Sequence, residues 1–333
     1  MSYYIFNFAK TIVNVWPSIA KETTLAKILW EIDAFRITLS PWYDDVNKRY
    51  LESIQKMDNS KTIMLDLKWP EIKTRIDHDL EVKKWKKVFV KYTSYFEDEE
   101  NTIFTDYQHI DDVPKGEIAE VRECWVKIKV LEYEDNKLIC EVVQWWIIKS
   151  NKEFTFDRYV PRIHFVSKKD EKDLIRCVNN WVKIVLAWTV RFADDIKALR
   201  HALANINWKD IKVFAKFETL QAIENIEDIL PLCDWVLVSK KLIDKVWDDF
   251  EKQKEFIIEK ANVFGKTSIV ETRILADDEK KPDQNIIDNI TKDILCWADG
   301  FALWDEVSSW PNAVEAVEEL YDLIIKQQEK IDT

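Results

Sequence analysis

The stretch IKVFAKFET (residues 211–219) decides the fold, because an apolar run ends in Lys216 and Glu218 and passes at once into the helical pattern TLQAIENIEDIL. Side chains alternate along a strand, so Lys216 and Glu218 point the same way. A cation and a carboxylate at the end of a strand that leads into a helix are typical of the active sites of β/α barrels. The alternative interpretation is a solvated ion pair, since a Lys-x-Glu spacing is common.

The same unit repeats along the chain: a short apolar run, a polar corner, and a segment with helical periodicity. The runs that predict strands are 11–15, 34–39, 62–67, 182–187, 212–217, 235–240, 268–272 and 300–304. Helical patterns lie between them, as at 24–32, 45–57, 172–180, 193–206, 219–230 and 250–264, and after the last of them at 313–328. Such alternation indicates a β/α barrel or a long doubly wound sheet, and eight units favour an α/β fold of the TIM (β/α)8 type.

One segment breaks this pattern. From residue 76 to residue 163 the sequence alternates between polar and apolar residues, as in KVFVKYTSY and EVRECWVKIKVLEY. Without these 88 residues the chain keeps 245 of its 333 residues, close to the roughly 250 typical of the barrel. We therefore expect residues 1–75 and 164–333 to form the barrel, with 76–163 as an all-β lid domain inserted after strand 3.

Composition narrows the class of protein. With 47% hydrophobic residues the chain can bury a sizeable core. A net charge of −12 argues against a nucleic-acid surface, which is normally basic. The five cysteines have no C-x-x-C spacing, which favours reduced thiols. No apolar run reaches membrane-spanning length and the start resembles no signal peptide. We expect a cytoplasmic protein with no nucleic-acid or membrane partner.

The chain has 3 glycines and 16 tryptophans, although average usage would give roughly 23 glycines. Several tryptophans stand where turns favour glycine, such as Trp16 and Trp69 before a proline and Trp297 in CWADG. Indole side chains do not take a positive φ cheaply, whereas glycine does. Our hypothesis is that the gene uses a code in which one stop codon means glycine, rendered as Trp in the printed sequence. The alternative is a truly Trp-rich protein.

Several segments carry a resemblance to a known family. The segment MLDLKWPEIKTR (64–75) is similar to the L-D-T-K-G-P-E-I-R-T-G motif of pyruvate kinases, and TIVNVWPS (11–18), FRITLS (35–40), KVFAKFETLQAIENIEDIL (212–230) and ADGFAL (298–303) continue the similarity. A barrel interrupted after its third strand is that family's architecture as well. The resemblance ends after the helix that follows the eighth strand, which implies a chain without the family's C-terminal regulatory domain.

The resemblance also bears on the tryptophans. The positions at which the family usually carries glycine are Trp16, Trp42, Trp69, Trp125, Trp181, Trp235 and Trp297.

The resemblance implies a chemistry. Pyruvate kinases transfer a phosphoryl group from phosphoenolpyruvate to ADP in the last step of glycolysis, using a divalent metal and usually potassium. The expected activity is therefore a pyruvate kinase-like phosphotransferase with Mg²⁺ (or Mn²⁺) and K⁺ as cofactors. Its implied partners are phosphoenolpyruvate and ADP/ATP, and a homo-oligomer is left open.

The family's functional residues can be carried over position by position. Lys216 matches the catalytic lysine that contacts the phosphoryl group, and Glu218 matches the first metal carboxylate. Arg36 matches the arginine that holds phosphate, and Thr272 matches the threonine near the enolate. The remaining assignments are Lys73 at the place of a family arginine, Lys68 beside Arg36 in cofactor binding, and Ser40 and Asp66 as monovalent-cation ligands.

Departures from the family pattern leave a second interpretation open. The segment SKKLID (239–244) places Leu242 where the family has its second metal aspartate, so that Asp244 is the nearest substitute. Thr38 and Leu67 replace an asparagine and a threonine among the potassium ligands. The alternative is a catalytically impaired pyruvate kinase-like protein that binds a phosphorylated metabolite or a protein partner.

Overall fold

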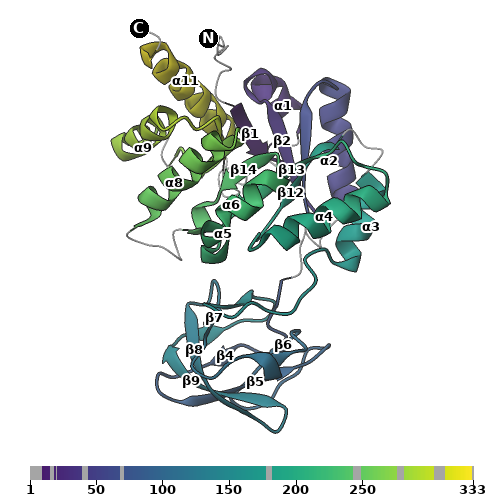
Figure 1. Ribbon diagram of the computed structural model, residues 1–333, viewed down its shortest axis with the longest axis vertical. Coiled ribbons are helices and arrows are strands. Elements are labelled where there is room, and N and C mark those ends of the chain that lie inside the picture. Colours follow the sequence, from purple (N-terminus) through teal and green to yellow (C-terminus); the bar gives the residue numbers. More distant parts are fainter. Residues whose placement is uncertain are drawn as a thin grey trace. The chain divides into compact units, whose positions relative to one another are not determined.

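The computed structural model describes residues 10–15, 19, 21–39, 44–67, 71–177, 182–242, 249–275, 281–303 and 312–331. Contacts divide the chain into two units, one formed by Met1–Trp69 and Phe165–Thr333 and the other by Pro70–His164. Figure 1 shows helices around the strands of the first unit, whereas the second unit is built from strands. No helix within the described ranges is long and apolar enough to cross a membrane.

Eight parallel strands close into a barrel in the first unit. They are β1 (Lys10–Asn14), β2 (Ala34–Thr38), β3 (Thr62–Asp66), β12 (Val182–Ala187), β13 (Lys212–Phe217), β14 (Trp235–Val238), β15 (Thr267–Thr272) and β16 (Gly300–Leu303). Their order around the barrel is β1-β16-β15-β14-β13-β12-β3-β2. These are the eight runs that the sequence predicts as strands, and the expected TIM (β/α)8 class is confirmed.

Gly300 is required where the barrel closes. It pairs in register with Lys10 of β1 on one side and Ile269 of β15 on the other. A Cβ atom at this position would lie 2.4 Å from the Lys10 carbonyl oxygen and 2.9 Å from Cδ1 of Ile269. Such contacts leave no room for a side chain at residue 300. Glycine therefore allows β16 to pair with both β1 and β15 and close the barrel.

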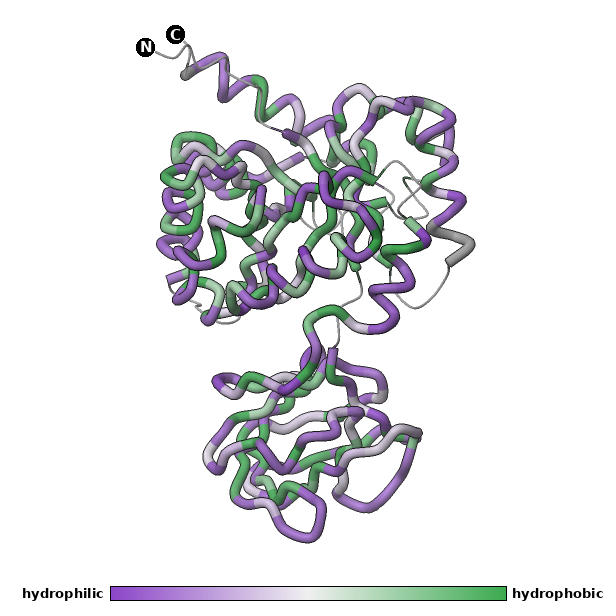
Figure 2. Tube along the Cα trace, turned by 45° about the vertical axis from the view of Figure 1, so that its right-hand side comes forward, coloured by the Kyte–Doolittle hydropathy of each residue, from purple (hydrophilic) through white to green (hydrophobic). Residues whose placement is uncertain are grey.

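Helices cover the outside of the barrel (Figure 1). They are α1 (Glu22–Ile28), α2 (Asp44–Met57), α3 (Lys168–Cys177), α4 (Ala193–Asn205), α5 (Leu220–Glu224), α6 (Ile226–Ile229), α8 (Phe250–Val263), α9 (Gln284–Leu295) and α11 (Ala313–Ile331), with 3-10 turns η1 (Leu29–Glu31), η3 (Leu230–Leu232) and η4 (Lys240–Leu242). Along the helices the trace alternates between hydrophilic and hydrophobic residues (Figure 2). This amphipathic pattern places one face of each helix against the sheet.

The helix predicted at 219–230 is interrupted. Thr219 caps its start, since the Thr219 hydroxyl accepts a hydrogen bond from the Ala222 amide at 3.1 Å. Asn225 follows α5 with φ −105° and ψ 19°, outside the helical conformation, and both its backbone amide (3.0 Å) and its side-chain amide (2.8 Å) donate to the Gln221 carbonyl. Pro231 is the second residue of the turn η3, which follows α6. The predicted helix is therefore three short pieces, α5, α6 and η3, of which Asn225 separates the first two.

Two apolar layers hold the barrel together. Inside it, each strand contributes at least one buried residue to a single cluster: Ile12, Ala34, Met64, Ile184, Leu186, Phe214, Leu237, Ile269 and Ala302. A larger cluster fills the space between the sheet and the helices, with Phe35, Val213 and Phe217 among its strand members. Neighbouring residues of one strand thus face opposite layers, as the period of two demands.

The second unit is an all-β structure with its own core. Its strands are β4 (Leu80–Glu81), β5 (Lys87–Tyr92), β6 (Thr102–Thr105), β7 (Ile118–Val121), β8 (Val126–Glu134), β9 (Lys137–Gln144), β10 (Ile147–Ile148) and β11 (Phe154–Phe156). Six of them form one sheet in the order β11-β7-β8-β9-β5-β6. Asp135 and Asn136 join β8 to β9 with positive φ at both residues, as tight hairpins require.

The second unit begins at Pro70, earlier in the chain than the change of period indicates. The period change predicts a boundary at residues 75–76, but contacts group residues from Pro70 onward with the insert. Lys73 bridges to Glu153 and Thr74 bridges to Thr105, both antiparallel.

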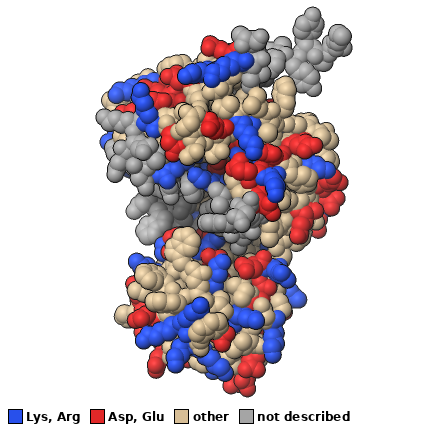
Figure 3. Space-filling model, turned by 90° about the vertical axis from the view of Figure 1, so that its left-hand side faces the viewer, with Lys and Arg blue, Asp and Glu red and all other residues tan. Residues whose placement is uncertain are grey.

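On the face visible in Figure 3, acidic and basic side chains intermix on each of the two units.

Among the described residues, three tryptophans have a left-handed backbone: Trp85 (φ 66°), Trp125 (φ 55°) and Trp297 (φ 69°). Their side chains are exposed, at 65%, 66% and 65%. Glycine adopts this conformation without steric cost, whereas a bulky residue there is a genuine outlier. At Trp125 and Trp297 the backbone supports glycine independently of the family resemblance.

The other suspected glycine positions are less informative. Trp235 lies in β14 without a positive φ, and its ring packs edge-on against Phe214 at 5.4 Å. The remaining four, Trp16, Trp42, Trp69 and Trp181, lie outside the described residues.

Candidate active site

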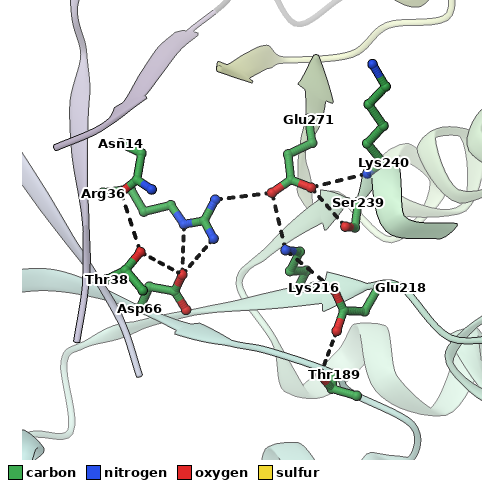
Figure 4. A network of polar contacts seen from close by, with 10 residues as sticks. All are labelled: Asn14, Arg36, Thr38, Asp66, Thr189, Lys216, Glu218, Ser239, Lys240 and Glu271. Atoms are coloured by element: carbon green, nitrogen blue, oxygen red, sulfur yellow. Dashed lines mark hydrogen bonds and ion pairs between the residues drawn. The ribbon is translucent and has the colours of Figure 1, made fainter. Parts of the chain in front are cut away.

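A polar layer lies directly above the apolar cluster inside the barrel. On β13 it is reached two residues after Phe214, at Lys216, and on β15 two residues after Ile269, at Glu271. The same step leads from Ala34 to Arg36 on β2. Residues two apart share a face of the strand, so the C-terminal ends of the strands present polar side chains to the interior. Figure 4 shows this layer, which includes Asn14, Arg36, Asp66, Lys216, Ser239 and Glu271.

Arg36 and Asp66 form a buried pair in this layer. The guanidinium donates from Nε at 2.9 Å and from Nη2 at 2.6 Å, both to Oδ2 of Asp66. The Thr38 hydroxyl lies 3.3 Å from the same oxygen and 3.5 Å from Oδ1 of Asn14. Strands β2 and β3 are neighbours with Thr38 in register with Asp66, so the sheet itself brings these groups together.

Lys216 and Glu218 lie side by side, as their spacing predicts. The Lys216 Nζ is 3.5 Å from Oε2 of Glu218. The Thr189 hydroxyl donates to Oε1 of Glu218 at 2.6 Å. The Lys216 ammonium also lies 4.8 Å from the centre of the Trp188 ring. Both side chains are almost fully buried, which excludes the solvated ion pair considered for this spacing.

Glu271 is a member of the site that the sequence analysis missed. Its Oε1 lies 3.1 Å from Nη1 of Arg36 and 3.3 Å from Nζ of Lys216. Its Oε2 accepts hydrogen bonds from the Ser239 hydroxyl at 2.8 Å and the Lys240 amide at 3.2 Å. Burial alone would raise the pKa of this carboxyl, but Lys216 and Arg36 outweigh it and lower the pKa to about 2.

A signal for Glu271 was present in the sequence. It stands two residues beyond Ile269 in a predicted strand, so it shares the inward face of the apolar residue that precedes it. The resemblance directed attention to Thr272 instead, which ends β15 and is half-buried. Within the described part of the chain, Thr272 has no hydrogen bond through its side chain, and its assignment stays a prediction.

The other predicted site residues fall elsewhere. Lys73 belongs to the second unit, where its ammonium pairs with Glu71 at 2.9 Å. Ser40, Lys68 and Asp244 lie outside the described residues. Leu242, at the place of the family's second metal aspartate, is completely buried in the cluster between sheet and helices. The structure thus brings together Arg36, Asp66, Lys216 and Glu218 of the predicted set.

Opposite charges are paired in this cluster. Among the described residues, two cations, Arg36 and Lys216, face three carboxylates, Asp66, Glu218 and Glu271. Such pairing is needed to keep these side chains charged in the interior, because removing each ion from water costs several kcal/mol. Preorganised cations beside carboxylates can hold an anionic group on one side and a metal ion on the other.

Comparison with known proteins agrees with this geometry. The family model described as "Pyruvate kinase, barrel domain" matches residues 10–309. The chain is 24% identical over 335 residues to a pyruvate kinase of Clostridium perfringens, which covers 97% of this chain and 71% of that protein.

Two further relatives are pyruvate kinases of Geobacillus stearothermophilus and Kluyveromyces lactis. They are 21% and 28% identical over 84% and 81% of this chain. The chain spans only 49% and 56% of their lengths. Since the family model covers most of the chain, and the barrel with its polar layer is in place, this protein belongs to the pyruvate kinase family.

Proposed function

We propose that the polar layer of the barrel binds phosphoenolpyruvate and transfers its phosphoryl group to ADP. The observation that carries this proposal is the convergence of Arg36 and Lys216, two buried cations from different strands, beside the carboxylate of Glu218. Phosphoryl transfer needs little covalent chemistry from a protein. It depends on positioning the reactants and on neutralising charge as the group moves.

Each residue has a proposed role. Lys216 contacts the phosphoryl group as it leaves the enol oxygen of phosphoenolpyruvate and joins an oxygen of the ADP β-phosphate. Arg36 holds the same group through its guanidinium, whose orientation Asp66 fixes. The enolate left behind then takes a proton on carbon to give pyruvate, with Thr272 placed near it by the family resemblance.

The residues present fit a divalent metal. Mg²⁺ prefers oxygen ligands and is often held by one or two carboxylates together with substrate phosphates. Glu218 supplies such a carboxylate, buried at the strand end and oriented by the Thr189 hydroxyl. When bound there, the metal neutralises charge on the transferring phosphoryl group. Asp244 as a further ligand stays a prediction.

Oxygen donors for potassium are fewer than in the family pattern. Asp66 and the Thr38 hydroxyl lie together, 3.3 Å apart. Leu67, which stands at the place of a threonine, is completely buried and offers no side-chain oxygen. Potassium therefore remains part of the proposal through Asp66, with Ser40 as its predicted companion.

The alternative is a protein that binds a phosphorylated metabolite or a protein partner without turning over. The position of Leu242 favours it, because the lost metal aspartate is replaced by a core residue rather than by another ligand. The retained cations favour catalysis, since binding alone would not require the Lys216–Glu218 pair.

A coupled assay for pyruvate formation from phosphoenolpyruvate and ADP decides between them. It is best run both on the printed sequence and on protein with glycine at the suspected tryptophans. Lys216→Met should lower kcat by about 10²–10³, the usual cost of one preorganised donor. Lys212→Met is the matched control, because Lys212 lies at the opposite end of β13 and its side chain is 56% exposed. No pyruvate formation by the parent protein would favour the binding-protein alternative.

A further inference from the structure

Glu271 occupies the position between the two cations of the polar layer. One oxygen, Oε1, contacts both Nη1 of Arg36 at 3.1 Å and Nζ of Lys216 at 3.3 Å. These contacts come from three different strands, β2, β13 and β15. A single anionic oxygen that two converging cations share is what a phosphoryl oxygen would offer them.

The rest of the Glu271 carboxylate is also held. Its second oxygen accepts from the Ser239 hydroxyl and the Lys240 amide, and the side chain is 1% exposed. The carboxyl is ionised at neutral pH because the two cations lower its pKa to about 2. An incoming phosphate therefore meets cations that already have an anionic partner.

We infer that Glu271 is an internal counter-anion that occupies the phosphoryl-binding position and sets the affinity of the site for phosphate-bearing ligands. It gives Arg36 and Lys216 a shared anionic partner in the free protein, in addition to Asp66 and Glu218, and so lowers the cost of burying both cations. A phosphoryl group must displace it from at least one cation to bind. This inference rests on the proposed function in taking Arg36 and Lys216 as the phosphoryl-binding groups.

The charge balance supports this role. Glu271 is the carboxylate that lies against both cations, and its negative charge opposes an anionic ligand at that position. Replacing Glu271 by neutral glutamine removes this charge and keeps the shape of the side chain. The amide can still accept a hydrogen bond from the Ser239 hydroxyl, so the polar layer need not collapse.

Calorimetric titration of the protein with inorganic phosphate tests the inference. Glu271→Gln should bind phosphate roughly tenfold to a hundredfold more tightly than the parent protein, because a charge-assisted hydrogen bond no longer competes. Asp293→Asn is the matched control. Its carboxylate forms a buried pair with Lys254 at 2.6 Å, between α8 and α9 rather than in the polar layer, so phosphate affinity should not change.

A second variant covers the case in which Glu271→Gln does not fold. Ser239→Ala removes the 2.8 Å hydrogen bond to Oε2 of Glu271 and leaves every charge in place. Its phosphate affinity should rise in the same direction but by less, because Glu271 is more easily displaced. Unchanged or weaker phosphate binding in the variants that fold would overturn the inference.

Binding of Mn²⁺, measured by electron paramagnetic resonance, separates this role from metal ligation. Loss of Mn²⁺ binding in Glu271→Gln with no gain in phosphate affinity would make Glu271 a metal ligand and end the inference. None of these titrations requires turnover. If the parent protein forms no pyruvate but Glu271→Gln binds phosphate more tightly, the inference holds and the proposed reaction is refuted. If the parent protein forms pyruvate but Glu271→Gln does not bind phosphate more tightly, the proposed reaction holds and the inference is refuted.

Discussion

The guanidinium of Arg36 donates twice to one oxygen of Asp66, from Nε at 2.9 Å and from Nη2 at 2.6 Å. The two side chains are 3% and 0% exposed. Breaking a buried ion pair by removing one partner commonly costs about 3–5 kcal/mol. Loss of either partner should therefore destabilise the barrel, and the pair fixes the orientation of a cation in the site.

Arg36→Lys should weaken both properties. Lysine keeps the charge but is a point donor and loses the planar fork that reaches Asp66 and Glu271 together. We expect a loss of roughly 1–3 kcal/mol in the free energy of unfolding, measured by urea denaturation, and weaker phosphate binding by calorimetry.

The insert supplies a matched control for this variant. Arg75 donates from Nε at 3.1 Å and Nη2 at 2.6 Å to one oxygen of Asp106, but the two side chains are 27% and 26% exposed. Arg75→Lys should cost less, because exposed pairs contribute only about 0–1 kcal/mol. Equal losses of unfolding free energy in Arg36→Lys and Arg75→Lys would show that burial of the Arg36–Asp66 pair does not increase its effect on stability.

Most of the barrel was predictable because its signals are local. An apolar run followed by a helical period identifies each β/α unit, and the count of such units selects the barrel. The single helix predicted at 219–230 is wrong because Asn225 leaves the helical conformation between α5 and α6, and a break of one residue does not change the apolar period.

The candidate site was predictable only in part. Arg36, Lys216 and Glu218 follow from motifs, whereas Glu271 lies in the segment ETRIL (271–275), in which the resemblance assigned a role to Thr272 alone. Its contacts join β15 to β2 and β13, and the distance between those strands is set by closure of the sheet. Because Glu271 stands two residues after Ile269, the sequence predicts that its side chain points into the barrel. Its partners, Arg36 and Lys216, are known only from the closed barrel.

Stability should depend on pH through Glu31. Its Oε2 is buried with no hydrogen-bond partner in the described part of the protein. Burial, and then repulsion from Glu318 and Asp322, raise the pKa of Glu31 from 4.5 to about 7. The folded protein therefore holds a proton there that the unfolded chain loses near pH 4.5. This contribution to the free energy of unfolding is full below pH 4.5 and is lost as pH rises through about 7.

Glu31→Gln should remove that dependence. Thermal unfolding measured across this pH window should show a flatter profile for the variant and a gain in stability above pH 7. Glu52→Gln is the control, since the Glu52 side chain is 62% exposed. A parent and a Glu31→Gln protein with parallel pH profiles would show that Glu31 does not titrate between those limits.

Leu242→Asp addresses the missing metal aspartate. Because Leu242 is completely buried in the apolar cluster, a carboxylate there should destabilise the protein by at least as much as Leu242→Ala, which typically costs about 2–5 kcal/mol. Mg²⁺ should not restore the loss in thermal unfolding experiments. Recovery of stability on addition of Mg²⁺, seen in Leu242→Asp but not in Leu242→Ala, would mean that the new carboxylate reaches a metal ion.

The tryptophans with positive φ give the sharpest test of the recoding hypothesis. An L-residue in the left-handed region costs roughly 1–2 kcal/mol more than glycine, and the side chains of Trp85, Trp125 and Trp297 are 65%, 66% and 65% exposed. Each Trp→Gly variant should therefore raise the melting temperature, and mass spectrometry of the native protein should show glycine at these positions.

Trp30 separates backbone strain from simple loss of an exposed indole. It is 65% exposed, like Trp85 and Trp297, but it lies in the 3-10 turn η1 without a positive φ, and its ring packs edge-on against Tyr321 at 5.0 Å. Trp30→Gly should lower the melting temperature, because glycine adds chain entropy and removes that contact. If all four variants shifted stability in the same direction, or native peptides carried tryptophan at positions 125 and 297, the protein would be truly rich in tryptophan.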